Sequence, residues 1–91
     1  MEIRWSVEAA DDLERIVQDI LQNNPPAARR VAKTLYDGIA GLRDFPNRGR
    51  NGRMEGTREL VFSPLPYIVV YRIKQQTLEV MRVCHAAQDW P

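Results

Sequence analysis

The sequence lacks several features that mark particular classes of protein. Its one cysteine, Cys84, cannot form an internal disulfide, so nothing in the sequence indicates an oxidising compartment. No apolar run approaches the ~20 residues of a membrane span, and Glu2 and Arg4 put charges at the N-terminus with no apolar segment behind them. We therefore expect a cytoplasmic protein that is neither exported nor embedded in a membrane.

An excess of charge of one sign is also missing, because the net charge is only +1 over 91 residues. A protein that binds nucleic acid with its whole surface would be more basic, so any such contact must come from local clusters. Hydrophobic residues make up 44% and charged residues 27%, which is usual for one globular domain, here residues 1–91. Chains of this size bury only about 60 to 65% of their unfolded surface, so a tightly bound partner can add much to their stability.

The first half of the chain predicts a strand and two helices. Residues 1–5 alternate between apolar and charged side chains, as a strand does. Ser6 is a good N-cap, and Asn24 with Pro25 and Pro26 ends one helix and opens the next. So short a turn predicts an antiparallel helical hairpin. The apolar residues recur three and four positions apart, as Ala10, Leu13, Ile16, Val17, Ile20 and Leu21 in the first helix and Ala28, Val31, Ala32, Leu35, Ile39 and Leu42 in the second.

The second half of the chain predicts a sheet. Residues 47–56 are rich in Gly and Arg, which indicates an exposed basic loop or a short edge strand. Three runs rich in Val, Ile, Leu, Phe and Tyr follow, over 58–62, 67–74 and 78–84, and their short connections predict an antiparallel meander. The order strand, helix, helix and then three or four strands predicts an α+β fold with the helices on one side of the sheet.

Several stretches of this sequence resemble the RelE/ParE superfamily of bacterial toxins. They are Ala9-Ala10-Asp11-Asp12-Leu13 with Ile16, Asn24-Pro25 with Ala27-Ala28, Leu42 with Phe45-Pro46, Gly49-Arg50, Thr57-Arg58-Glu59-Leu60-Val61, Pro66-Tyr67-Ile68-Val69-Val70-Tyr71-Arg72, and Arg82-Val83-Cys84-His85 with Gln88 and Trp90-Pro91. No single stretch is as specific as a metal-ligand signature, but their order and spacing together are hard to obtain by chance.

The resemblance implies both a fold and a role. The fold would be an N-terminal strand, an antiparallel two-helix hairpin and a three- to four-stranded antiparallel sheet. The role would be that of a toxin from a type II toxin–antitoxin module, which arrests growth and is neutralised in a hetero-oligomer with a cognate antitoxin. Members similar to RelE cut messenger RNA in the ribosomal A site, whereas members similar to ParE inhibit DNA gyrase and are not known as nucleases. Fold alone does not choose between these activities.

A nuclease of this type needs a base, an acid and cations for the phosphate. The resemblance would make Glu59 the base and place His85 among the catalytic residues after the last strand. Arg58, Arg72 and Arg82 could bind phosphate, since guanidinium groups match its oxygens in pairs. The alternative, purely structural roles are a hydrogen bond for His85 and, for Glu59, a surface ion pair with Arg58 worth under about 1 kcal/mol.

One departure from the RelE-like pattern favours the gyrase inhibitor. Ile68 stands where those enzymes have an arginine, and Val61 occupies a second basic position, so with Val70 they leave an apolar patch. We therefore prefer a ParE-like inhibitor with no cofactor, no metal and no chemistry of its own. Ribosome-dependent RNA cleavage is the alternative, and a non-toxic antitoxin-binding module is a third. Cys84 is expected to be a buried small side chain rather than a metal ligand.

Two surfaces are candidates for binding partners. Arg48, Arg50, Arg53 and Arg58 place four cations within eleven residues, which predicts a docking patch in preference to a merely solvated loop. Gln88 and Trp90 are further docking candidates, although packing of Trp90 against the protein is the simpler interpretation. The expected antitoxin contacts are an exposed sheet edge and the apolar stripes of the hairpin, at Leu13, Val17, Leu21, Val31 and Leu35.

Overall fold

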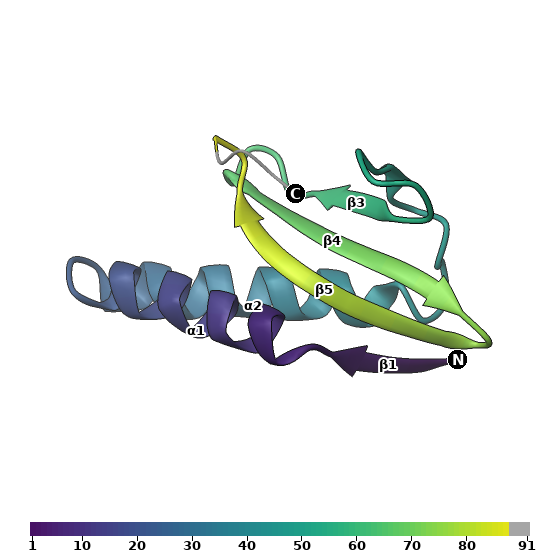
Figure 1. The fold of residues 1–91 in the computed structure, drawn as a ribbon. Coiled ribbons are helices and arrows are strands. Elements are labelled where there is room, and N and C mark those ends of the chain that lie inside the picture. Colours follow the sequence, from purple (N-terminus) through teal and green to yellow (C-terminus); the bar gives the residue numbers. More distant parts are fainter. Residues whose placement is uncertain (88–91) are drawn as a thin grey trace.

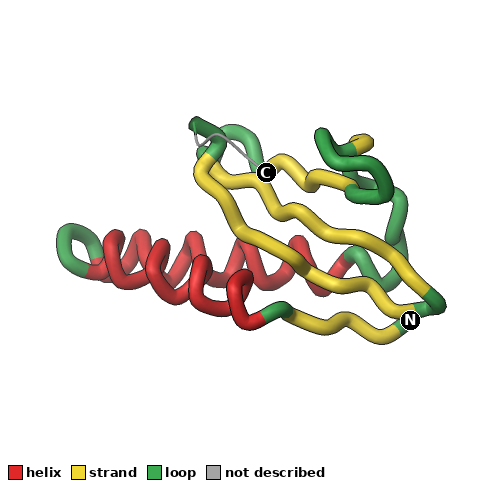
Figure 2. Tube along the Cα trace, in the orientation of Figure 1, coloured by secondary structure: helices red, strands yellow, loops and turns green. Residues whose placement is uncertain are grey.

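The computed structural model, described over residues 1–87, has a two-helix hairpin lying against one face of a sheet (Figure 1). Both helices are on the same side of the strands, as predicted (Figure 2). The elements are β1 (Glu2–Trp5), α1 (Val7–Leu21), α2 (Pro25–Gly41), β2 (Arg50–Asn51), β3 (Arg58–Val61), β4 (Tyr67–Lys74) and β5 (Thr77–His85). Within residues 1–87, no helix is both long and apolar enough to cross a membrane.

The predicted N-caps begin both helices. Ser6 Oγ accepts a hydrogen bond from the amide of Ala9 at 3.0 Å and donates one to the carbonyl of Met81 at 2.8 Å. Asn24 Oδ1 accepts from the amide of Ala27 at 3.1 Å, and the prolines that follow fill first-turn positions whose N–H groups have no helical acceptor. The start of α1 is thereby fixed both to its own first turn and to β5.

The sheet has five strands in the order β1-β5-β4-β3-β2. The meander of β3, β4 and β5 is antiparallel, which confirms the sequence prediction. However, β1 pairs in parallel with β5, where Ile3 lies opposite Leu78, and the two residues of β2 add a short edge. The sequence predicted β1 as a strand but not its partner, because the pairing of β1 depends on a strand far away in the sequence, for which no local pattern exists.

The core fills the space between the hairpin and the sheet. It consists of Ala9, Leu35, Ile39, Leu42, Val69, Tyr71, Leu78, Val80 and Val83, and Trp5 packs against it while partly exposed. Leu35, which we expected on the antitoxin-binding surface, is fully buried instead. It lies on the part of the apolar stripe of α2 that faces the sheet, so it stabilises the fold and does not belong to a docking surface.

Tyr71 connects this core to the loop after α2. Its fully buried side chain donates a hydrogen bond to the carbonyl of Pro46 at 2.7 Å and accepts one from the amide of Gly49 at 2.9 Å. A Cβ on Gly49 would lie 2.8 Å from the Tyr71 hydroxyl, so a larger residue there would break this contact. The backbone of residues 46–49 is therefore held by a side chain of the core.

Candidate functional site

Glu59, the predicted base, lies in β3 on the sheet face that does not pack against the core, and its carboxylate is engaged on both oxygens. Oε1 accepts hydrogen bonds from Arg50 Nε at 3.2 Å and Nη2 at 3.0 Å, and Oε2 accepts from the amide of Arg53 at 3.1 Å. The residue is only 3% exposed. The proposed surface ion pair with Arg58 is therefore wrong: Glu59 is buried, and its cation is Arg50 from the neighbouring edge strand.

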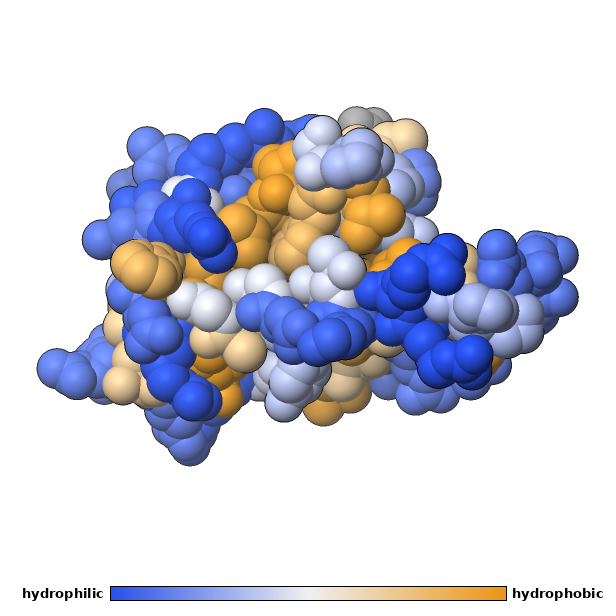
Figure 3. All heavy atoms as spheres, turned by 180° about the vertical axis from the view of Figure 1, so that it is seen from behind, coloured by the Kyte–Doolittle hydropathy of each residue, from blue (hydrophilic) through white to orange (hydrophobic). Residues whose placement is uncertain are grey.

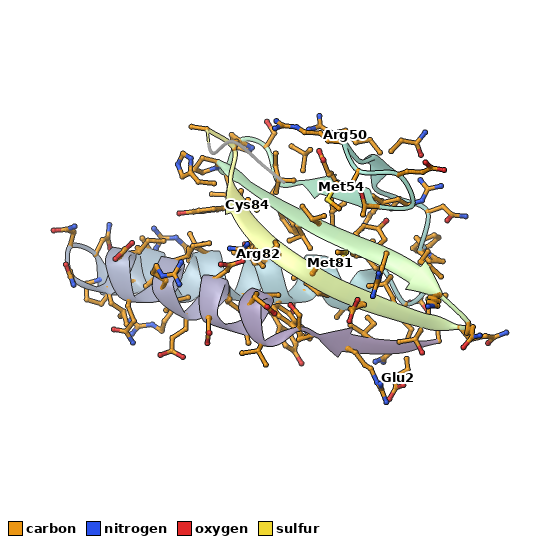
Figure 4. The ribbon with its side chains drawn as sticks, in the orientation of Figure 1. Glu2, Arg50, Met54, Met81, Arg82 and Cys84 are labelled. Atoms are coloured by element: carbon orange, nitrogen blue, oxygen red, sulfur yellow. The ribbon has the colours of Figure 1, made fainter. Side chains whose placement is uncertain are left out.

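The same carboxylate holds the 47–56 loop on the sheet. β2 pairs with β3, with Arg50 opposite Glu59, so the ion pair and the strand pairing act at the same place. Figure 4 shows Arg50 and Met54 on this loop and Cys84 at the end of β5. Glu59 therefore stabilises the position of this loop on the sheet.

Beside Glu59 is a small, mostly apolar hollow. Glu59 is paired with Val70, and Val61 with Ile68, so these four side chains share one face, as the sequence indicated. The hollow encloses only about 10 Å³, room for at most one water molecule. Its lining residues are Arg53, Glu59, Ile68, Val70, Cys84, His85 and Ala86. Cys84 is buried, as predicted, and burial raises the pKa of its thiol.

His85 lies at the end of β5 and borders this hollow. Its Nδ1 accepts a hydrogen bond from the amide of Ala87 at 3.2 Å, and its ring meets the edge of Tyr67 with centroids 5.8 Å apart. Strand pairing brings Tyr67 and His85 opposite one another. His85 also lines a second pocket of about 240 Å³ against α1, with Arg15 and Asp19. The structure therefore places both His85 and Glu59 at one hollow, although Glu59 is engaged by the loop.

The three arginines expected to bind phosphate are engaged elsewhere. Arg58 Nη1 donates to the carbonyls of Gly49 at 2.7 Å and Asn47 at 3.3 Å. Arg72 Nε donates to Glu79 Oε1 at 2.8 Å, on a different part of β4 and β5. Arg82 pairs with a carboxylate of α1. The structure does not gather these arginines around Glu59.

The carboxylate that pairs with Arg82 belongs to Asp12, a functional candidate that was not among the site residues predicted from the sequence. It is 5% exposed, and it accepts hydrogen bonds from Arg82 Nε at 2.7 Å, from Arg82 Nη2 at 2.9 Å and from the amide of Val83 at 3.0 Å. Burial alone would raise the pKa of Asp12, but the hydrogen bonds from Arg82 and Val83 lower it below the ordinary value. Asp12 lies three residues after Ala9 and four before Ile16, which both face the core, and this spacing was a signal that could have identified it.

The arginines of the predicted basic docking patch differ in how far they are exposed and bound. Arg48 and Arg53 have exposed side chains, and the guanidinium carbon of Arg48 lies 5.9 Å from the centroid of the Phe45 ring. Arg50 is exposed along its length but bound to Glu59 at its end. Gln88 and Trp90, the remaining docking candidates, lie outside the described residues.

An open apolar groove, which we call the helical groove, runs across the hairpin. It has a volume of about 420 Å³, and its lining residues are Trp5, Ala10, Leu13, Glu14, Val17, Gln18 and Tyr36. Leu13 and Val17 were predicted as antitoxin contacts, whereas Tyr36, 62% exposed, was missed. Of the other predicted contacts, Leu21 is exposed and Val31 packs against the core.

Apolar surface is also visible from another side. Seen from behind, apolar side chains gather near the middle of the molecule and hydrophilic ones border them (Figure 3). Monomeric proteins rarely leave large contiguous apolar surfaces in water, so such surfaces commonly mark contacts with a partner.

Among residues 1–87, there is no group of three or more His, Cys, Asp or Glu side chains placed to hold a metal ion.

Comparison with known proteins gives one consistent picture. The family model of the ParE toxin of type II toxin-antitoxin systems, parDE, matches residues 3–90. The chain is 40% identical over 89 residues to "Putative toxin Y4kP" of Sinorhizobium fredii, which covers 98% of this chain and 92% of the relative. It is 34% identical over 87 residues to "Toxin RelE2" of Caulobacter vibrioides, which covers 96% of this chain and 97% of the relative.

Two solved structures have a similar fold. One is described as "Chromosomal ParDE TA system from P. aeruginosa", with a TM-score of 0.86 at 23% identity, covering 93% of this chain and 95% of that one. The other is described as "YoeB/ParE toxin from Agrobacterium tumefaciens", with a TM-score of 0.64 at 21% identity, covering 93% and 98%. At these identities the likeness shows the fold alone.

Proposed function

The chain belongs to the ParE toxin family of type II toxin-antitoxin systems, and from this premise we propose that it arrests growth by binding DNA gyrase rather than by cutting RNA. The toxin acts in the cytoplasm through surface contacts, without a cofactor. A cognate antitoxin masks it by forming a hetero-oligomer.

The state of Glu59 is the observation that carries this proposal. A general base must accept a proton from a group within about 2.6–3.2 Å. Both oxygens of Glu59 already accept hydrogen bonds, from Arg50 and from the amide of Arg53, and the residue is almost fully buried. RNA cleavage would therefore require the loop to leave Glu59, and the buried carboxylate would lose its cation.

The surroundings of Glu59 support the same conclusion. Phosphoryl transfer needs cations directed at the oxygens on which charge develops. Here Ile68, Val70 and Cys84 line the hollow beside Arg53, Arg50 is bound to Glu59 itself, and Arg72 and Arg82 are bonded to carboxylates of other elements. An apolar hollow with room for at most one water molecule suits packing better than it suits an RNA backbone.

We further propose two contacts for the antitoxin. An amphipathic helix of the antitoxin occupies the helical groove, where Val17 and Tyr36 offer apolar contacts. An extended segment adds to the sheet at the Val61 end of β3. In the described part of the chain, β2 pairs only with Arg58 and Glu59, so that end of β3 is an exposed edge.

Ribosome-dependent RNA cleavage is the second candidate, and one observation favours it: His85 and Glu59 line the same hollow. The two functions are separated by adding purified protein, with and without antitoxin, to a gyrase supercoiling assay and to translating ribosomes. We expect supercoiling to stop and messenger RNA to stay intact. Cleaved messenger RNA with normal supercoiling would show that the nuclease interpretation is right. If induced expression does not slow growth at all, the chain is a non-toxic antitoxin-binding module.

A further inference from the structure

Phe45 is unusually exposed for an aromatic residue in the turn after a helix. It comes after α2, and 64% of it is accessible to solvent. With Pro46, Asn47 and Arg48 it borders an open hollow that shares no lining residue with the helical groove. Leaving a phenyl ring in water is unfavourable by about 1.5–3 kcal/mol relative to burying it. The ring therefore gains stability if a partner covers it.

The ring is held on a rigid base. The amide of Phe45 donates to the carbonyl of Gly41 at 3.2 Å, and the amide of Arg48 donates to the carbonyl of Phe45 at 3.1 Å. Further along the turn, the buried hydroxyl of Tyr71 donates to the carbonyl of Pro46 and accepts from the amide of Gly49. Because this backbone is held in place, only the ring itself has to be ordered on binding, which lowers the entropic cost for an interface anchor.

Arg48 shapes the surroundings of the ring. Its guanidinium carbon lies 5.9 Å from the ring centroid, so the cation covers one face of the phenyl group. Arginine beside an exposed aromatic residue is the composition typical of the central contacts in protein interfaces. A nucleobase that stacked on this face would have to displace the guanidinium, so the arrangement favours a protein partner over RNA.

Charge indicates what kind of protein surface fits. Residues 43–59 contain five arginines and three carboxylates, whereas the whole chain has a net charge of only +1. One of those carboxylates, Glu59, is buried and bound to Arg50; without this pair, four arginines and two carboxylates remain, so the excess of positive charge around the turn is unchanged. The partner surface that complements this region is acidic, with an apolar depression for a phenyl ring.

We propose that Phe45, with Arg48 against it, is a protein-docking anchor that inserts into an acidic-rimmed apolar pocket of the toxin's target. This inference deepens the proposed function, because it says which part of the toxin contacts the target, and it rests on that function. The anchor is separate from the helical groove, so antitoxin contacts and target contacts use different residues.

The test compares Phe45→Ala and Phe45→Leu with Val7→Ala as the matched control. Val7 is 74% exposed at the start of α1 and borders none of the proposed surfaces. Each variant is assayed for growth arrest, for the concentration that half-inhibits supercoiling by purified gyrase, for antitoxin affinity and for melting temperature. We expect Phe45→Ala to raise the half-inhibiting concentration about 30-fold, the size of a lost interface hot spot. Phe45→Leu should have an intermediate effect, and Val7→Ala should match the wild type.

Melting temperature and antitoxin affinity should be unchanged in all three variants, which shows that they fold. If Phe45→Ala arrests growth as well as the wild type does, the anchor is wrong, whatever the target. If the wild type inhibits gyrase and Phe45→Ala inhibits it equally, the anchor is wrong while the proposed function stands. If the wild type leaves supercoiling unaffected and Phe45→Ala abolishes ribosome-dependent RNA cleavage, both the protein partner and the proposed function are overturned.

Discussion

Asp12 of α1 and Arg82 of β5 form a two-pronged ion pair between residues 70 positions apart, with Nε–Oδ2 and Nη2–Oδ1 distances of 2.7 and 2.9 Å. The amide of Val83 adds a third hydrogen bond to the same carboxylate. This pair joins the hairpin to the sheet on the strand that ends at His85. Its contribution can be measured as a change in the free energy of unfolding when one partner is replaced.

Removing the carboxylate should destabilise the fold. We expect Asp12→Ala to lower the free energy of unfolding by about 2–3 kcal/mol, because it leaves Arg82 and the amide of Val83 without their acceptor. Asp11→Ala is the matched control, since Asp11 is exposed and adjacent, and it should change stability by less than about 0.5 kcal/mol. Urea unfolding followed by circular dichroism measures both. Equal losses in the two variants would show that the ion pair is not what stabilises this region.

The same pair predicts how stability depends on pH. The folded pKa of Asp12 is lowered from its ordinary value of 3.8, so the unfolded chain binds the proton more readily. The stabilisation is fully present above the unfolded pKa and is lost as pH falls through the folded pKa. In urea titrations at successive pH values, the stability difference between wild type and Asp12→Asn should shrink as pH drops below about 3.8. A difference that stays constant down to pH 2 contradicts the assignment.

Arg50 should matter to stability more than an exposed loop arginine normally does. Arg50→Ala leaves the buried carboxylate of Glu59 without its cation, and we expect a loss of about 2–3 kcal/mol. Arg48→Ala removes an exposed cation that lies over the Phe45 ring and should cost less than about 1 kcal/mol. Thermal unfolding compares the two variants. For this reason, replacing Arg48, Arg50 and Arg53 together would confuse lost docking with lost folding, and single variants are the better test of the basic patch.

His85 separates an inhibitor from an enzyme. If the toxin acts on gyrase, His85→Gln should keep most of its growth arrest, because a side-chain amide can take over from the imidazole in accepting the hydrogen bond from Ala87. If it is a nuclease, His85→Ala and Glu59→Ala should each reduce the rate of messenger RNA cleavage by about 100-fold or more. Cleavage on the ribosome that disappears in His85→Gln would refute the inhibitor.

The helical groove predicts the effect of Tyr36 on antitoxin binding. Tyr36→Ala should weaken antitoxin affinity by about 10-fold to 100-fold, since an exposed aromatic side chain that lines an apolar groove is a typical hot spot. Ile73→Ala on β4 is the control, because Ile73 is a partly exposed apolar residue that does not line the groove. Isothermal titration with the purified antitoxin measures both affinities. Unchanged binding in Tyr36→Ala would place the antitoxin elsewhere.

Local patterns in the sequence predicted the local structure. The caps at Ser6 and Asn24, the spacing of apolar residues in both helices and the meander of three strands all depend on neighbours within a few positions, and each is present. The apolar face formed by Val61, Ile68 and Val70 followed from strand alternation in the same way.

What the sequence could not show depends on contacts between distant residues. Nothing near Glu2–Trp5 indicates that this strand lies parallel to β5, and nothing near Asp12 names Arg82 as its partner. Glu59 looked like an exposed residue because its neighbour Arg58 is charged, yet the fold of the loop buries it and supplies Arg50 instead. The roles of residues at the candidate site could therefore be assigned only from the three-dimensional arrangement.

The parallel pairing of β1 with β5 also affects when this protein can become harmful during its synthesis. A nascent chain that has passed α2 has made β1 and Asp12, but neither has its partner until residues 77–85 emerge from the ribosome. Products of interrupted translation lack the strand between β1 and β4, and with it the surface on which the hairpin packs. Incomplete chains should therefore be degraded rather than toxic, and the cell faces a folded toxin only once nearly all of this sequence has been translated.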